Sequence, residues 1–350
     1  MQLNQFFLTT IQSIAWGSTL RNHKKITSIH QVLVTGGAGF IGSHLCEALI
    51  DQGHRVTAID DLSTGRLENI SHLMSNSAFK FVRETILNAQ ILDRLCSQSD
   101  LVIHLAAAVG VKLIVENPVH TIKTNVMGSE AVLNTANRYG CKVMLASSSE
   151  VYGKGARVPF HEDDDCLIGP TTHSRWAYAT SKALDEFLSL AYNHQFDLPV
   201  VVMRFFNTIG PRQTGRYGMV VPRFVRQALR NEPLEVYGDG EQSRCFADVA
   251  DVVRAILDLM DCEQAAGQVF NIGSTQEITI SELAKLVIQL ANSQSKIIYL
   301  PYEKAYAPGF EDMRRRVPSI EKISRYIGFS PQYSLDQSLN RVISYESSAA

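Results

Sequence analysis

Two side chains four positions apart, Tyr178 and Lys182, could together remove a proton from an alcohol. Residues i and i+4 of a helix share one face, so the phenol and the ammonium would be neighbours. A positive charge beside a phenol stabilises the phenolate and lowers its pKa from about 10. Such a tyrosine could act as a general base while hydride leaves the same carbon for a nicotinamide. The pair therefore predicts redox chemistry on a hydroxyl group.

A run of serines upstream could support this chemistry. Ser148 and Ser149 follow the apolar run Val143–Ala146, which predicts a buried strand. Ligands bind at the carboxyl ends of parallel strands, so the Ser148 hydroxyl could hydrogen-bond the reacting hydroxyl. The alternative role of these serines is to cap the end of the strand.

A glycine loop near residue 40 predicts a dinucleotide site. The stretch from Gly37 to Gly42 fits G-x-G-x-x-G, and it lies between a short apolar run, Val32–Val34, and a segment with helical spacing. In that context the glycines allow a tight turn, and the helix N-terminus binds a pyrophosphate. The residues predicted to contact the dinucleotide here are Gly36, Gly37, Gly39, Phe40, Ile41 and Gly42.

An acidic residue follows at the position that reads the cofactor ribose. Asp60 ends the second apolar run, Arg55–Ile59. A carboxylate there accepts hydrogen bonds from the ribose hydroxyls and repels a 2′-phosphate, which favours NAD over NADP.

The elements that must hold these residues alternate between strand and helix. Further apolar runs predict strands, and segments with a helical period separate them. This alternation predicts right-handed βαβ units and a doubly wound parallel sheet, the Rossmann α/β fold, in residues 31–205. After Arg204 the periodicity is lost, and residues 206–345 predict a smaller C-terminal α/β domain with some interleaving. The predicted strands are 55–59, 79–82, 101–105, 143–146, 200–203, 234–237 and 269–272, and the predicted helices are 40–52, 89–96, 119–139, 176–194, 222–230, 249–260 and one from 281.

Composition narrows the function classes. The net charge is −2 and offers no basic face, so nucleic acid is not an expected partner. Residues 1–30 are too polar to span a bilayer and are interpreted as an N-terminal extension. The cysteines show no zinc spacing and predict reduced thiols in a cytoplasmic protein. The acidic run at 162–165 predicts a solvated loop, so no metal site is expected.

Motifs along most of the chain resemble the extended short-chain dehydrogenase/reductases that act as nucleotide-sugar epimerases, dehydratases and decarboxylases. They run in family order from about residue 31 to 340: 35–42, 60–65, 104–107, 147–153, 178–182, 204–207, 210–212 and 237–240 with Arg244. The resemblance implies further NAD contacts from Asp61, Ser63, Thr64, Gly65, Leu105, Ala106, Ala107, Asn125, Tyr178 and Lys182. One departure is Thr85, which stands where the family usually has an aspartate near the adenine.

All members of this group begin by oxidising a sugar carbon, and the next step divides them. The Ser148-Ser149-Glu150 triplet is similar to that of UDP-glucuronate decarboxylases, and Arg316 lies in a similar Arg-x-Pro-Ser-Ile segment. The resemblance implies that Glu150 and Arg316 position a uronic acid and that Glu150 helps to protonate C5. A solvated basic turn is the other interpretation of Arg316. The Arg175-Trp176 sequence, just before Tyr178, is also similar to the corresponding sequence of a decarboxylase domain.

Three other functions stay open at this point: a UDP-glucose or UDP-glucuronate 4-epimerase, a 4,6-dehydratase and a catalytically silent NAD-binding scaffold. Silent members usually lose the tyrosine or the lysine, and this chain keeps both. The resemblance also implies a homodimer formed through the long helices. The candidates for contacts to the UDP-sugar are Ser149, Arg175, Asn207, Arg223, Tyr237, Arg244 and Arg316.

Overall fold

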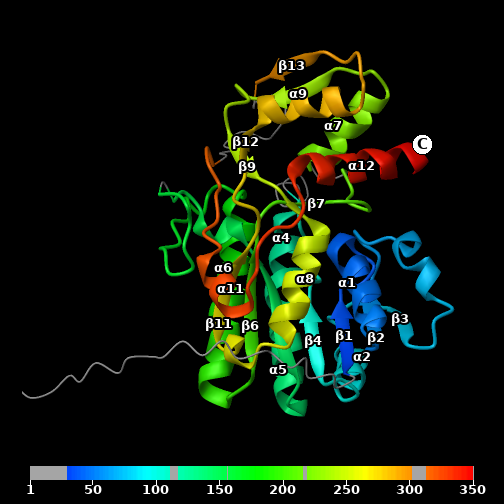
Figure 1. Ribbon diagram of the computed structural model, residues 1–350. Helices are drawn as coiled ribbons and strands as arrows, with labels where there is room; N and C mark the ends of the chain where they lie inside the picture. The colour runs from blue at the N-terminus through cyan, green and yellow to red at the C-terminus, as the bar shows by residue number, and fades with distance from the viewer. Residues whose placement is uncertain (1–29, 111–116, 156, 216–218, 302–312, 350) are drawn as a thin grey trace, which may run out of the picture.

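The computed structural model describes residues 30–110, 117–155, 157–215, 219–301 and 313–349. Its centre is a seven-stranded sheet in the order β11-β6-β5-β4-β1-β2-β3, and every neighbouring pair is parallel. The strands of this sheet are β1 (Gln31–Thr35), β2 (Arg55–Asp60), β3 (Phe79–Arg83), β4 (Leu101–His104), β5 (Lys142–Ser148), β6 (Val200–Phe205) and β11 (Gln268–Ile272). The predicted Rossmann α/β fold is confirmed (Figure 1).

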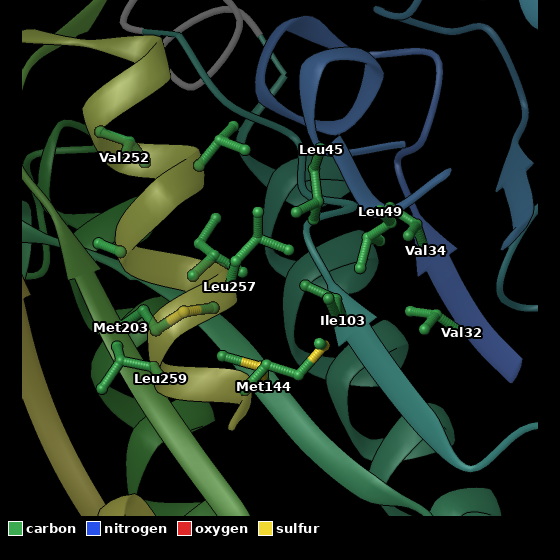
Figure 2. Packing of buried hydrophobic residues seen from close by; sticks show 14 of the residues in the cluster. Val32, Val34, Leu45, Leu49, Ile103, Met144, Met203, Val252, Leu257 and Leu259 are labelled. Carbon is green, nitrogen blue, oxygen red and sulfur yellow. The ribbon is translucent and has the colours of Figure 1, made fainter. Parts of the chain in front are cut away.

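Helices cover both faces of the sheet because successive strand residues point to opposite sides. Val32 and Val34 pack with α1 (Phe40–Asp51) and α8 (Val249–Met260) on one face, as Figure 2 shows. Leu33, between them, packs on the other face with α2 (Ala89–Cys96) and α5 (Gly128–Tyr139). Burial on both faces explains why the strands are continuous apolar runs.

The segment predicted as one helix over 119–139 is interrupted. It consists of α4 (Pro118–Ile122), the π-helical segment η3 (Lys123–Met127) and α5. The long helix α6 (Trp176–Phe196) packs against all three and carries the Tyr178–Lys182 pair.

A second, smaller core lies above the carboxyl ends of the strands (Figure 1). It is built from α7 (Val220–Leu229), α9 (Ile280–Leu290), α12 (Leu335–Ala349) and strands β8 (Leu234–Tyr237) and β13 (Ile297–Leu300). Short pairs join it to the sheet: β7 (Thr208–Ile209) with β10 (Ala247–Asp248), and β9 (Ser243–Cys245) with β12 (Glu277–Thr279). The remaining elements are α11 (Glu321–Ile327) and the 3₁₀ turns η1 (Leu67–Asn69), η2 (Ser71–Leu73), η4 (Ser149–Tyr152) and η5 (Glu263–Ala265).

The C-terminal part of the chain also contributes to the central sheet. Strand β11 pairs with β6, and α8 and α11 pack on the face that α1 covers. The chain thus crosses between the two cores more than once. The N-terminal extension proposed for residues 1–30 lies outside the described residues except for His30. Among the helices of the described ranges, none is long and apolar enough to cross a membrane, and the same ranges contain no cluster of metal-ligating side chains.

Candidate active site

A cavity of about 520 Å³ lies where the strands of the sheet end and the smaller core begins. Its walls bring together residues that are far apart in the sequence. Of the predicted site residues, it is lined by Gly36, Gly39, Phe40, Ile41, Gly42, Asp60, Asp61, Ser63, Thr64, Leu105, Ala106, Ala107, Ser148, Ser149, Glu150, Arg175, Tyr178, Asn207, Arg223, Tyr237, Arg244 and Arg316.

The glycine loop is packed too tightly for side chains. A Cβ at Gly42 would lie 2.2 Å from the Gly36 carbonyl oxygen, and one at Gly36 would lie 2.8 Å from the Ala106 nitrogen. Helix α1 begins directly after the loop, its N-cap residue Gly39 makes no side-chain cap, and its first turn carries no acidic residue. The amide groups of that turn therefore face the cavity as an anion site, which fits the diphosphate of NAD.

Asp60 lies at the end of β2, on the wall of the same cavity. Its carboxylate accepts hydrogen bonds from the backbone amides of Ala38, at 3.0 Å, and Leu62, at 2.8 Å. Burial raises the pKa of Asp60, while these amides oppose the rise. A carboxylate has about four acceptor positions, so Asp60 keeps capacity for ribose hydroxyls.

Tyr178 lines the cavity from the first turns of α6, and the Ser148 hydroxyl is hydrogen-bonded to its phenol. Burial raises the pKa of Tyr178, and the nearby negative charge of Glu150 raises it further, whereas the Ser148 hydrogen bond lowers it. The sequence predicted a lowered pKa from the adjacent Lys182. In the protein chain by itself, desolvation outweighs the positive charges, because a buried phenolate loses its hydration.

Glu150 lies between two buried arginines. Its carboxylate oxygens are 2.7 Å from Arg175 Nη1 and 2.7 Å from Arg316 Nη2. Burial alone would raise the pKa of Glu150, but Arg316 and Arg175 lower it to about 2. At neutral pH Glu150 is therefore a carboxylate and has no proton to give, so the expectation that it helps to protonate C5 does not fit its surroundings. The three side chains together carry one net positive charge beside Tyr178.

Backbone hydrogen bonds between two distant segments of the chain place Arg316 at this site. The Phe160 amide donates to the Val317 carbonyl, and the Ser319 amide donates to the Phe160 carbonyl, each at 2.8 Å. Arg316 is 7% exposed, whereas Arg314 and Arg315 form ion pairs at the surface with Asp239 and Glu277. The three consecutive arginines thus differ in role, and a solvated basic turn describes only the first two.

The candidates for the nucleotide also line the cavity. The Arg223 guanidinium stacks 4.0 Å from the centre of the Tyr237 ring. Arg244 Nη1 donates to two backbone carbonyls, which fixes its direction. Asn207 Oδ1 is buried and has no hydrogen-bond partner among the described residues, so it is available to a ligand.

Four predicted site residues do not line the cavity. Gly37 packs against Ala58, and Gly65 lies beside the Asp60 carboxylate. Asn125 accepts from the Ala108 amide at 2.8 Å and thereby supports the cavity wall from behind. Lys182 donates to Asp185 at 2.7 Å.

Sequence reasoning missed several wall residues. His120, Thr124, Gln213, Phe246 and Ile280 line the cavity. They belong to no local motif, so only the folded chain reveals them. Thr85, where the family usually has an aspartate, also lines the cavity.

Comparison with known proteins agrees with this geometry. Residues 32–273 match the sequence model of the NAD dependent epimerase/dehydratase family. A UDP-N-acetyl-alpha-D-glucosaminuronate decarboxylase of Bacillus cytotoxicus is 44% identical over 314 residues, which cover 89% of this chain and 96% of that protein. UDP-glucuronic acid decarboxylase 1 of Danio rerio is 37% identical over 90% of this chain and 72% of its own length.

Solved structures add the fold. The UDP-glucuronic acid 4-epimerase of Bacillus cereus, in complex with UDP-glucuronic acid and NAD, superposes with a TM-score of 0.82 at 31% identity, covering 91% of this chain and 100% of that one. The epimerase Mth375 of Methanothermobacter thermautotrophicus gives a TM-score of 0.84 at 31% identity, covering 92% of this chain and 93% of that one. Because the match spans most of the chain and keeps the motifs of the site, this chain is a member of the NAD dependent epimerase/dehydratase family.

Proposed function

We propose that this protein is an NAD-dependent decarboxylase of a UDP-linked uronic acid, acting through a C4-keto intermediate. The observation that carries the proposal is the cluster of Glu150, Arg175 and Arg316 beside Tyr178. Its net positive charge suits an anionic sugar, because a guanidinium pairs with a carboxylate through two parallel hydrogen bonds. The decarboxylase names of the relatives at 44% and 37% identity support the same reaction.

The chain supplies the groups for the first step. NAD, when bound, accepts a hydride from C4 of the sugar and can later return it. We assign the glycine loop to its diphosphate and Asp60 to its ribose. Tyr178 removes the proton of the 4-hydroxyl, and the Ser148 hydroxyl, which is hydrogen-bonded to the phenol, orients that oxygen. We assign Lys182, one helical turn further along α6, to favour the phenolate by its positive charge.

The second step follows from the ketone. A 4-keto uronate is a β-keto acid, so its carboxylate leaves as CO₂ while the electrons move into an enolate. Full pairing of that carboxylate with two arginines would stabilise the ground state and oppose its loss. Glu150 forms an ion pair with each of the two arginines. We infer that Glu150 weakens the binding of the substrate carboxylate by Arg175 and Arg316. The arginines then orient this carboxylate without strongly stabilising the ground state.

Other side chains that line the cavity are suited to the rest of the substrate. We assign Asn207, Arg223, Tyr237 and Arg244 to the nucleotide and its diphosphate, and Ser149 to the sugar. A 4,6-dehydratase needs a protonated acid beside its base. Glu150, with a pKa of about 2, and its neighbour Ser149 do not provide one.

Turnover with two uronates tests the proposal. The protein and NAD⁺ are incubated with UDP-glucuronate or UDP-N-acetylglucosaminuronate, and CO₂ and the sugar nucleotides are measured. We expect CO₂ and a UDP-pentose, or its 4-keto form, from at least one of them. A new UDP-hexuronate without CO₂ would identify a 4-epimerase instead, and no reaction with any UDP-, dTDP- or GDP-sugar would favour a silent NAD-binding protein.

We also propose that the protein is a homodimer joined through α4, η3 and α6. These neighbouring helices expose an apolar patch of Val119, Ile122, Met127, Leu184 and Phe187. A contiguous apolar surface of this kind marks an interface, and a second copy with the same patch fits it by two-fold symmetry. The six unpaired cysteines suit the reducing cytoplasm, which is the location we propose.

Substitution of the most exposed residue of this patch tests the dimer. Phe187 is 73% exposed in the single chain. Phe187→Glu should convert the dimer to a monomer, because a charge would be buried in an apolar contact. Sedimentation velocity measures the change. Phe196→Glu, on the same helix but outside the patch, should stay dimeric; a dimer that survives Phe187→Glu would place the interface elsewhere.

A further inference from the structure

The ammonium of Lys182 is held by a buried carboxylate one helical turn further along α6. Lys182 Nζ lies 2.7 Å from Asp185 Oδ2, and the two side chains are 3% and 1% exposed. A buried ion pair of this kind fixes both partners, because neither has water as an alternative. The position of the Lys182 charge relative to Tyr178 is therefore set in part by Asp185.

Asp185 is in turn the end of a chain of hydrogen bonds that runs beneath the cavity. The Ala106 amide donates to Thr35 Oγ1 at 3.2 Å, and Thr35 Oγ1 lies 2.7 Å from His104 Nδ1. His104 Nε2 lies 3.2 Å from Ser129 Oγ, and the nearby Ser129 hydroxyl lowers the pKa of the Asp185 carboxylate.

The chemistry of these groups fixes the direction of the hydrogens. Asp185 as a carboxylate only accepts, so the Ser129 hydroxyl donates to it. Ser129 then accepts from His104, whose hydrogen is on Nε2, and the free Nδ1 accepts from the Thr35 hydroxyl. Burial, with the charge of Lys182, lowers the pKa of His104 to about 3, which agrees with a neutral ring. Every donor in the network points toward Asp185.

We propose that Asp185, held by Ser129 and His104, is a positioning residue that fixes the Lys182 ammonium and limits how strongly it stabilises the Tyr178 phenolate. The network joins the wall of the cofactor cavity, at Ala106, to the general base. The inference rests on the roles proposed above for Tyr178 and Lys182. It adds that the proton affinity of Tyr178 depends on a carboxylate that does not line the cavity.

The electrostatic surroundings determine the sign of the effect. The negative charge of Asp185 raises the pKa of Tyr178. The other groups that face Tyr178 or Asp185 are Glu150, Arg316 and Ser148 for the phenol, and Lys182, Ser129 and Glu186 for the carboxylate. Removing the charge of Asp185 leaves the ammonium fully available to the phenolate, so the pKa of Tyr178 should fall.

Asp185→Asn tests this directly. We expect the acidic limb of the pH profile of kcat/KM for the uronate substrate to move toward lower pH by about one unit. Asp185→Glu keeps the negative charge, so the acidic limb of its pH profile should lie close to that of the parent protein. Thermal unfolding is recorded for each variant. If Asp185→Asn does not fold, Asp185→Ser leaves room for water beside the ammonium and carries the same prediction.

Glu186→Gln is the matched control. Glu186 is the next residue of α6 and is also buried, but its carboxylate pairs with Arg204 at 2.7 Å. It should lose stability without a move of the acidic limb. An unchanged limb in a folded Asp185→Asn protein, or an equal move in Glu186→Gln, would overturn the proposal.

A second measurement separates this inference from the choice of reaction. In protein labelled with ¹³C at the tyrosine Cζ and saturated with NAD⁺, the signal of Tyr178 is assigned by its absence in Tyr178→Phe. At a fixed alkaline pH, Asp185→Asn should show a larger ionised fraction than the parent. This readout needs no sugar, so a wrong substrate leaves it intact, whereas equal ionisation in the two proteins would contradict the role of Asp185.

Discussion

Tyr178→Phe should lower kcat by about 100- to 10,000-fold, the range that general acid–base catalysis contributes. The change removes only the phenolic oxygen that we propose as the general base, so NAD⁺ should bind with nearly unchanged affinity. In the parent, kcat/KM should rise with pH on the acidic side, because burial raises the pKa of Tyr178 and the phenol must ionise to act as a base. Initial rates of CO₂ release and a fluorescence titration with NAD⁺ measure the two effects.

Tyr152→Phe is the control for this substitution. Tyr152 is also fully buried near the serine run, but its hydroxyl donates to Asn271 Oδ1 at 2.7 Å and it does not line the cavity. Because this hydroxyl also accepts a hydrogen bond from Arg204 Nη1 at 2.9 Å, its loss should cost about 1–3 kcal/mol of stability, and kcat should stay close to that of the parent. If Tyr178→Phe turned over at the full rate, the general base would be another residue.

Glu150→Gln should have the second large effect, on both stability and rate. The pKa of Glu150 is lowered from an ordinary value of 4.5 to about 2, which corresponds to about 3 kcal/mol of stabilisation at neutral pH. Because the folded pKa lies below the unfolded one, this stabilisation is present above about 4.5 and is lost as the pH falls toward 2. The difference in unfolding free energy between parent and variant should therefore shrink on acidification.

The rate effect of Glu150→Gln distinguishes its role from simple structural support. Without the carboxylate, Arg175 and Arg316 lose their ion pairs with Glu150 and should hold the substrate carboxylate more tightly. We expect kcat to fall while KM stays the same or decreases, because the ground state is held more tightly. A raised KM with an unchanged kcat would show that Glu150 itself binds the sugar. Urea denaturation at several pH values and steady-state kinetics provide the data.

Glu277→Gln is the matched control for stability. The pKa of Glu277 is also lowered to about 2, and it pairs with the neighbouring arginine, Arg315, but the Arg315 side chain is 56% exposed. Solvent-exposed ion pairs contribute about 0–1 kcal/mol. A loss in Glu277→Gln as large as that in Glu150→Gln would show that burial does not decide the strength of these pairs.

Local sequence patterns were sufficient to predict those features of the protein that depend on residues close together in the chain. Three local patterns illustrate this: the glycine loop between β1 and α1, the position of Asp60 and the Tyr178–Lys182 spacing. Most of these residues line one cavity in the structure. The apolar runs became the strands of a parallel sheet because a strand buried on both faces needs no polar alternation. The fold class and the family could be predicted for this reason.

The tertiary structure decided what depends on contacts between distant segments. Backbone pairing with Phe160 helps to place Arg316, and not Arg314 or Arg315, beside Glu150. The addition of β11 beside β6 likewise depends on long-range register rather than on any local motif.

Burial and ion pairing determine which side chains of the site are ionised. Glu150 was expected to donate a proton, but two buried arginines keep it ionised. Lys182 was expected to stabilise the phenolate, and in the folded chain it is also paired with Asp185. A sequence gives the types of ionisable groups and their spacing along one helix. Their pKa values depend on desolvation and on partners from other elements, which exist only once the chain is folded.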